Sequence, residues 1–306
     1  MKLLITGACG FIGSKVSSVL CNEASVTTID NCRTGYVSNM PRNVRLIRGN
    51  CQDPDIIMQL ENENFDAILH IAGQSSGEIS FEDPIYDLQT NTQSTLMLLD
   101  YALKNRCNTF IYASTMSVYG DGHIAPVLEG DSLNPSSFYA IGKIASEQYL
   151  KLYSSYGLRT ISLRLFNVYG PGQNMKNMKQ GMLSIYLSQL VNNGKIVVKG
   201  SPQRFRDFVH IKDVTNAFHK ALSIEKEGYS CFNIGSGNKK SINEIIEMMK
   251  VITEKNFPVE YTAGTPGDMH GIVANIEKAN NELNWQPNID FEIGFTEFIN
   301  WGFKKE

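Results

Sequence analysis

Apolar residues in the first half of the chain gather in short, nearly unbroken runs, separated by stretches with helical spacing. The runs that we predict as strands are Leu3–Thr6, Val26–Asp30, Val44–Arg48, Ala67–Ile71, Thr109–Ala113 and Thr160–Leu165. The stretches that we predict as helices are Ile12–Cys21, Asp53–Glu61, Asn91–Asn105 and Tyr139–Tyr156. Strands without polar alternation are buried on both faces, and strands that alternate with helices are typical of a parallel sheet. The pattern therefore predicts an α/β protein with a doubly wound parallel sheet.

The pattern changes after about residue 166, where Gly170-Pro171-Gly172 interrupts the chain. Beyond it we expect a helix over Leu183–Asn193, a strand over Cys231–Ile234 and a helix capped by Ser241. We expect residues 1–168, with a return segment at about 206–234, to form the sheet domain. Residues 169–205 and 235–306 should form a smaller C-terminal α/β substrate domain at the carboxyl edge of the sheet, where ligands of such sheets bind.

Composition narrows the class of protein. The 306 residues include 42% apolar and 19% charged side chains, which predicts a folded core. A net charge of −3 provides no basic field for nucleic acid or an anionic membrane surface. We expect neither a transmembrane helix nor a signal peptide, because no long apolar run is present and Lys2–Ile5 is typical of a buried strand. Six scattered cysteines without a CxxC pair or nearby histidine ligands predict reduced thiols, no metal site and a cytoplasmic protein.

A glycine-rich turn follows the first predicted strand and opens the first predicted helix. Gly7 permits the tight turn, Gly10 lets a pyrophosphate approach the backbone, and Gly13 allows close packing of helix and strand. Asp30 ends the second strand, where its carboxylate can accept hydrogen bonds from ribose hydroxyls and repel the 2′-phosphate of NADP. Arg33 nearby slightly weakens the preference for NAD over NADP. Together these features predict a Rossmann fold that binds NAD.

A second group of residues contains candidate catalytic side chains. Tyr139 and Lys143 are four residues apart on a predicted helix, so both side chains lie on one face. A lysine cation beside a tyrosine favours the phenolate and lowers the tyrosine pKa, which makes a general base. Ser114 and Thr115 follow a predicted strand at the edge where a substrate would bind, and a hydroxyl there can hydrogen-bond a substrate oxygen.

The glycine turn, Asp30, Ser114, Thr115, Tyr139 and Lys143 resemble the extended branch of the short-chain dehydrogenase/reductase superfamily. The resemblance is strongest to nucleotide-sugar epimerases of the UDP-glucose/UDP-galactose 4-epimerase type, through blocks at Ile71–Gly73, Asn91, Arg164–Gly172, Arg206–His210 and Gly267-Asp268. It implies NAD contacts by Gly7, Gly10, Phe11, Ile12, Gly13, Asp30, Asn31, Asn50, Cys51, Ile71, Ala72, Gly73, Asn91, Tyr139, Lys143 and Phe166. It implies nucleotide-sugar contacts by Ser75, Thr115, Asn167, Arg206 and Asp268.

The residues after Thr115 separate the reactions found in such enzymes. Dehydratases that resemble this chain carry acids there to move a proton and expel a hydroxyl, but Met116 and Ser117 cannot do that work. The resemblance then implies transient oxidation at C4, in which Tyr139 takes the hydroxyl proton, NAD takes the hydride, and Thr115 with Ser114 holds the C4 oxygen. An NAD-dependent sugar dehydrogenase or 4-ketoreductase remains the alternative, with a dehydratase or decarboxylase less favoured.

Two further expectations concern partners. The resemblance makes a UDP-sugar the first expectation. Thr265 stands where related epimerases often carry a second arginine for the diphosphate, so another nucleotide stays open. Related enzymes commonly dimerise through the helices after Asn91 and after Tyr139, so we expect a homodimer. The apolar residues with suitable spacing are Leu96, Leu98, Leu99, Tyr101 and Ala102, which could instead pack on the protein's own sheet.

Overall fold

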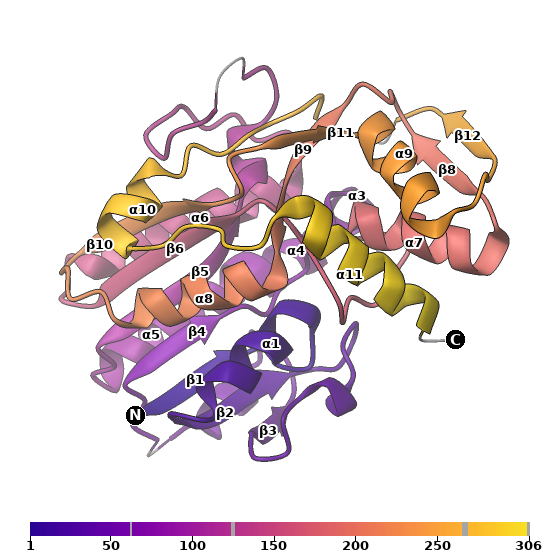
Figure 1. The fold of residues 1–306 in the computed structure, drawn as a ribbon. Coiled ribbons are helices and arrows are strands. Elements are labelled where there is room, and N and C mark those ends of the chain that lie inside the picture. The colour runs from indigo at the N-terminus through magenta and orange to yellow at the C-terminus, as the bar shows by residue number, and fades with distance from the viewer. Residues whose placement is uncertain (62, 124–125, 265–268, 305–306) are drawn as a thin grey trace.

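A computed structural model describes residues 1–61, 63–123, 126–264 and 269–304. Its largest feature is a sheet of seven parallel strands in the order β10-β6-β5-β4-β1-β2-β3 (Figure 1). The strands are β1 (Lys2–Thr6), β2 (Ser25–Asp30), β3 (Arg45–Arg48), β4 (Ala67–His70), β5 (Thr109–Thr115), β6 (Arg159–Leu165) and β10 (Tyr229–Ile234). The predicted doubly wound parallel sheet of a Rossmann fold is therefore confirmed.

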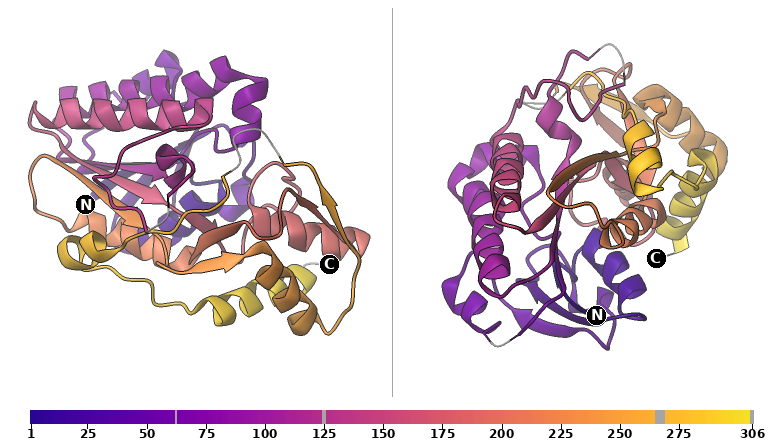
Figure 2. Two further views of the ribbon diagram at one scale, coloured as in Figure 1. Left: turned by 90° about the horizontal axis from the view of Figure 1, so that it is seen from above. Right: turned by 90° about the vertical axis from the view of Figure 1, so that its left-hand side faces the viewer.

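Helices cover both faces of this sheet, as Figure 2 shows from above. On one face α1 (Phe11–Leu20), α8 (Ile211–Leu222) and α10 (Glu277–Leu283) share a hydrophobic core with the strands. On the other face α2 (Pro54–Met58), α5 (Ser94–Lys104) and α6 (Phe138–Ser154) form a second core. Burial on both sides explains why the strand sequences are nearly continuous apolar runs.

The segment between β4 and α5 differs from its prediction. The sequence pattern predicts one helix from Asn91, but the structure has two short helices first, α3 (Gly77–Glu82) and α4 (Pro84–Leu88). Side chains of Ser76 and Asp83 cap them by accepting backbone N–H groups. A π-helical turn over Gln89–Gln93 then leads into α5. Helices this short have no apolar periodicity, so only their capping residues mark them in the sequence.

The remaining elements gather around a third core, to the right of Figure 1. Strands β7 (Asn167–Tyr169), β9 (Phe205–His210) and β11 (Lys239–Ser241) form one small sheet, and β8 (Ile196–Lys199) pairs with β12 (Val259–Thr262). Helices α7 (Met182–Asn193), α9 (Ile242–Thr253) and α11 (Phe291–Lys304) pack with these strands. Ser241 caps α9 in a capping box with Glu244, which confirms the predicted cap. Among the described residues, no helix is long and apolar enough to cross a membrane.

Candidate active site

A cleft of about 790 Å³ runs along the carboxyl ends of the central strands. Its walls come from the glycine turn and the end of β2, from the segment after β4, from β5 and α6, and from α7 and β9. Every site residue predicted from the sequence lines this cleft except Asn91, which is buried behind it, and Asp268, which lies outside the described residues together with Thr265. Residues from widely separated parts of the chain are thus brought to one place.

The glycine turn forms a cradle that fits a pyrophosphate. Gly7 adopts a φ of +80° and donates its N–H to Ile29 O at 2.9 Å. A Cβ at Gly13 would lie 2.1 Å from Gly7 O, so only glycine allows this packing of α1 against the turn. Gly10 caps α1 without a side-chain hydrogen bond, which leaves N–H groups of the first helical turn available to an anion.

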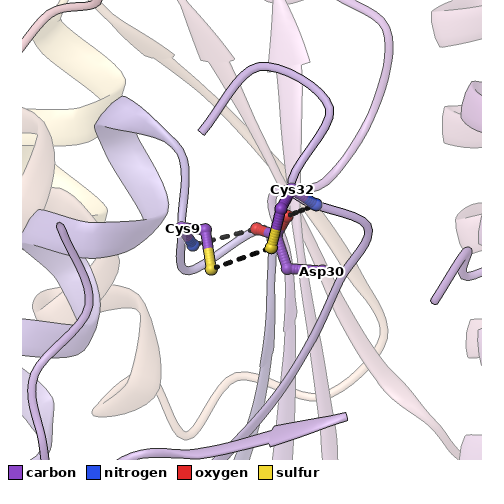
Figure 3. A group of neighbouring side chains, drawn as sticks. All are labelled: Cys9, Asp30 and Cys32. Atoms are coloured by element: carbon purple, nitrogen blue, oxygen red, sulfur yellow. Dashed lines mark hydrogen bonds between the residues drawn. The ribbon is translucent and has the colours of Figure 1, made fainter. Parts of the chain in front are cut away.

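Asp30 lies at the end of β2 beside this cradle. Figure 3 shows its carboxylate between two cysteines, accepting the N–H of Cys9 at 2.9 Å and the N–H of Cys32 at 2.7 Å. Each carboxylate oxygen has a second lone pair, so the hydroxyls of a ribose can still be bound. Atoms of these three residues that could bind a metal lie within 4.8 Å of one another, a grouping that the sequence spacing does not reveal.

The side chains of Tyr139, Lys143 and Thr115 lie together in the cleft. Lys143 Nζ donates to Ala113 O at 2.9 Å and lies 5.7 Å from the centre of the Tyr139 ring. Burial lowers the pKa of Lys143 to about 8, although the charges of Asp87 and Glu147 oppose this shift. Burial raises the pKa of Tyr139 to about 12, although a hydrogen bond with Thr115 opposes it. The predicted lowering of the tyrosine pKa is thus not reached by the protein groups alone.

Ser114 and Thr115 occupy opposite faces of β5, as neighbours in a strand do. The Ser114 hydroxyl donates to Glu147 Oε1 at 2.5 Å, and Glu147 also forms a buried ion pair with Arg164 at 2.7 Å. The Thr115 hydroxyl instead caps the turn after β5 by accepting Ser117 N–H at 3.2 Å. The hydroxyl beside Tyr139 therefore belongs to Thr115, whereas that of Ser114 is engaged in the core.

Asn91 belongs to a buried polar cluster behind the cofactor side of the cleft. Its Nδ2 donates to Gln74 O at 2.9 Å and to Asp87 Oδ1 at 3.1 Å, and Gln74 Nε2 donates to the same oxygen at 2.7 Å. Burial raises the pKa of Asp87, and the positive charge of Lys143 is among the influences that lower it. Sequence reasoning missed Gln74 and Asp87. The available signal was the spacing of Asp87 and Asn91, four residues apart in a helical stretch.

The opposite side of the cleft carries further basic groups. Arg206 is buried and donates to Phe205 O at 2.7 Å and Met269 O at 2.8 Å, and burial lowers its pKa to about 10. Asn167 Nδ2 donates to Asp207 O at 3.1 Å. Lys199, Arg204 and Tyr186 line the same side. Of these three, only Arg204 is marked in the sequence, because it lies two residues before Arg206.

Comparisons with known proteins agree with this geometry. Residues 3–235 match the NAD dependent epimerase/dehydratase family. A putative UDP-glucose 4-epimerase of Methanocaldococcus jannaschii is 32% identical over 302 residues, which cover 98% of this chain and 97% of the relative. The UDP-glucose 4-epimerase structure from Thermotoga maritima with UDP-glucose has a TM-score of 0.95 at 30% identity, covering 100% of this chain and 99% of that one.

A second solved structure is nearly as similar. It is the UDP-N-acetylglucosamine 4-epimerase of Methanobrevibacter ruminantium in complex with UDP-N-acetylmuramic acid. Its TM-score is 0.93 at 28% identity, with 100% of this chain and 99% of that chain covered. Because the family match spans most of the chain and carries the glycine cradle, the chain belongs to the NAD-dependent epimerase/dehydratase family of extended short-chain dehydrogenase/reductase enzymes, and NAD is its cofactor.

Proposed function

We propose that the protein is a UDP-sugar 4-epimerase of the UDP-glucose/UDP-galactose type, which acts through transient oxidation at C4 with tightly bound NAD. The observation that carries this proposal is the placement of Tyr139, Lys143 and Thr115 in the same cleft as the glycine cradle. A general base, a cation and a hydroxyl donor beside a dinucleotide site are the groups that reversible hydride transfer at a carbinol carbon needs.

The roles of the three side chains follow from their positions. Tyr139 accepts the proton of the C4 hydroxyl and later returns it. The Lys143 ammonium stabilises the phenolate through its charge, since Nζ lies 5.7 Å from the ring centre. Thr115 hydrogen-bonds the C4 oxygen, because its hydroxyl is the one that faces Tyr139. NAD supplies the hydride acceptor and donor for the C4 position.

The residues after Thr115 favour epimerisation over dehydration. Met116 is buried in a small hydrophobic core with Phe166, and Ser117 interacts with the Thr115 hydroxyl. Neither side chain can remove a proton from C5 and protonate a leaving hydroxyl, which is the work that elimination requires. A keto sugar that is held in this cleft is then reduced again, and reduction on its opposite face inverts C4.

The nucleotide side of the substrate is proposed to lie along the basic wall. Arg206 would bind the diphosphate and Asn167 the sugar nucleotide, with Ser75 nearby in the cleft and Asp268 as a further candidate. A guanidinium is well suited to phosphate oxygens because it offers paired donors and a permanent charge. The UDP-glucose and UDP-N-acetylmuramic acid in the two solved structures support UDP as the nucleotide.

We also propose that the protein forms a homodimer through α6. Leu98, Leu99, Tyr101 and Ala102 of α5 pack inside the protein's own core, so they do not supply such an interface. On α6, however, Phe138, Ile141 and Leu152 are exposed. Apolar side chains on one helix favour association with a second copy. Light scattering on Ile141→Glu and Leu152→Glu variants would test this, with a dimer expected only for the unmodified protein.

Turnover without added cofactor tests the proposed reaction. Purified protein should interconvert UDP-glucose and UDP-galactose with no NAD supplied, and NAD should be released when the protein is denatured. Parallel assays with N-acetylated and uronic acid UDP-sugars, and with GDP- and dTDP-sugars, would define the sugar and the nucleotide. Net accumulation of NADH with a keto product would instead favour the dehydrogenase alternative.

A further inference from the structure

We propose that Cys9 and Cys32 are a modification site, at which a peroxide oxidises the two thiols to a disulfide. The disulfide weakens binding of the adenosine end of NAD. Their sulfur atoms face each other 3.8 Å apart, beside the Asp30 carboxylate (Figure 3). Cys9 comes from the glycine turn and Cys32 from the loop after β2, so the bond would join two segments that both border the cofactor cleft.

The backbone around the two cysteines holds them together. Both of their N–H groups donate to the Asp30 carboxylate, at 2.9 Å from Cys9 and 2.7 Å from Cys32. The carbonyl of Cys9 accepts Tyr36 N–H at 3.0 Å and Asn39 Nδ2 at 3.0 Å. The two thiols therefore stay near each other in the folded protein. A disulfide bond of about 2.05 Å requires the two sulfurs to approach further.

The two thiols differ in exposure, and this difference assigns their order of reaction. Cys32 is partly exposed, whereas Cys9 is fully buried. Burial, together with the charge of Asp30, raises the pKa of Cys9 to about 12, so Cys9 is a poor first nucleophile. The Cys32 thiolate attacks the peroxide, breaks the O–O bond, becomes a sulfenic acid and releases water after proton uptake. The Cys9 sulfur then attacks Cys32, forming the S–S bond and releasing a second water.

The bond would act on NAD through Asp30. Neither sulfur lines the cleft, but Gly10, Asp30 and Asn31 do. Drawing the sulfurs from 3.8 Å to bonding distance shifts the two N–H donors that orient the Asp30 carboxylate. A carboxylate displaced from the ribose hydroxyls binds them less well, so the oxidised protein should release NAD faster. Reduction by a dithiol should reverse the effect, because the sulfurs are not oxidised beyond the disulfide.

A peptide map after mild oxidation tests the proposal. Holoprotein would be treated with a small excess of hydrogen peroxide, its remaining thiols alkylated, and its peptides analysed by mass spectrometry without reduction. We expect a cross-linked peptide pair containing Cys9 and Cys32, which a dithiol removes. Cys32→Ser should not form it. Cys21→Ser is the matched control, because Cys21 is also partly exposed and its sulfur donates to Ser18 O rather than to a thiol.

NAD release measured on the same samples tests the consequence. Displacement of NAD by an excess of labelled NAD should be severalfold faster for oxidised than for reduced protein. It should be unchanged by oxidation in Cys32→Ser, and the Cys21→Ser control should behave like the unmodified chain. Stable oxidation of Cys32 to sulfinic acid without a cross-link, a cross-link to a different cysteine, or a Cys9–Cys32 cross-link with unchanged NAD release would each overturn the proposal.

Discussion

The hydroxyl of Ser114 donates a hydrogen bond of 2.5 Å to the carboxylate of Glu147, on the opposite face of β5 from Thr115. Glu147 is in turn paired with Arg164, and Arg164 donates to the hydroxyl of Tyr119. Two adjacent hydroxyl residues thus have different tasks. Ser114 ties the strand that carries Thr115 to helix α6, which carries Tyr139 and Lys143.

This division of roles predicts different effects of two neighbouring substitutions. Ser114→Ala removes a hydrogen bond to a buried charge and should lower the free energy of unfolding by about 2 kcal/mol, with kcat little changed. Thr115→Val keeps the shape but removes the hydroxyl at the C4 oxygen, so kcat should fall by about 10²-fold. The lost cap on the turn after β5 should lower the free energy of unfolding by about 1 kcal/mol, less than in Ser114→Ala. Urea denaturation and steady-state assays check the pair. The reverse pattern would assign the reacting hydroxyl to Ser114.

Tyr139→Phe should abolish turnover and keep the cofactor. The phenol is the proposed acceptor of the C4 proton, and general bases contribute about 10²–10⁴-fold to rate. The ring itself remains, so the NAD content after purification should match that of the unmodified protein. Assays of UDP-glucose turnover and of released NAD provide both readouts. Full activity in Tyr139→Phe would refute the proposed base.

The pH dependence of turnover should report the coupling of Lys143 to Tyr139. Burial raises the pKa of Tyr139 to about 12, so the phenolate is scarce at neutral pH and activity should rise as the pH increases through the alkaline range. The pKa of Lys143 is about 8, so its side chain is positively charged at neutral pH and neutral in the alkaline range. Lys143→Met removes the charge that favours the phenolate, so kcat/KM should fall at neutral pH and change much less well above pH 8. The profile of kcat/KM against pH checks this, and an equal loss at every pH would mean that the charge of Lys143 does not influence the base.

His70 should make the stability of the fold sensitive to acid, independently of catalysis. It is fully buried between Thr6 and Ser94, and burial lowers its pKa from 6.5 to about 3. Between pH 6.5 and about pH 3, this histidine therefore takes up a proton in the unfolded chain but not in the folded chain. This destabilises the fold as the pH falls from about 6.5, by roughly 1 kcal/mol per pH unit. Urea denaturation at pH 6.5 and pH 5 should show a shallower loss of stability in His70→Asn than in the unmodified chain.

Much of the central sheet could be predicted because each strand is a run of buried apolar residues with its own local pattern. Strand β10 was recognisable as a strand, but its place beside β6 was not, because pairing partners are not encoded locally. Strands β7 and β11, with three residues each, are too short to show a period. Helices α3 and α4 have the same limitation, although Ser76 and Asp83 mark their starts.

The candidate site divides in a similar way. Gly7, Gly13 and Asp30 could be found because backbone geometry and distance along the chain restrict their identity. The link between Ser114 and Glu147 spans 33 residues, and no local pattern indicates it. The contact between Cys9 and Cys32 depends on the loop after β2 folding back toward the glycine turn, which only the three-dimensional structure reveals.

The fate of the hydrogen at C4 tests most directly whether NAD is reduced and then reoxidised within each turnover. UDP-glucose deuterated at C4 would be incubated with the purified protein in ordinary water, without added NAD, until epimerisation reaches equilibrium. The hydrogen removed from C4 is proposed to return to the same carbon, so UDP-galactose should carry the full deuterium label at C4. Loss of the label to solvent, or accumulation of a 4-keto product with reduced NAD, would contradict the proposed mechanism.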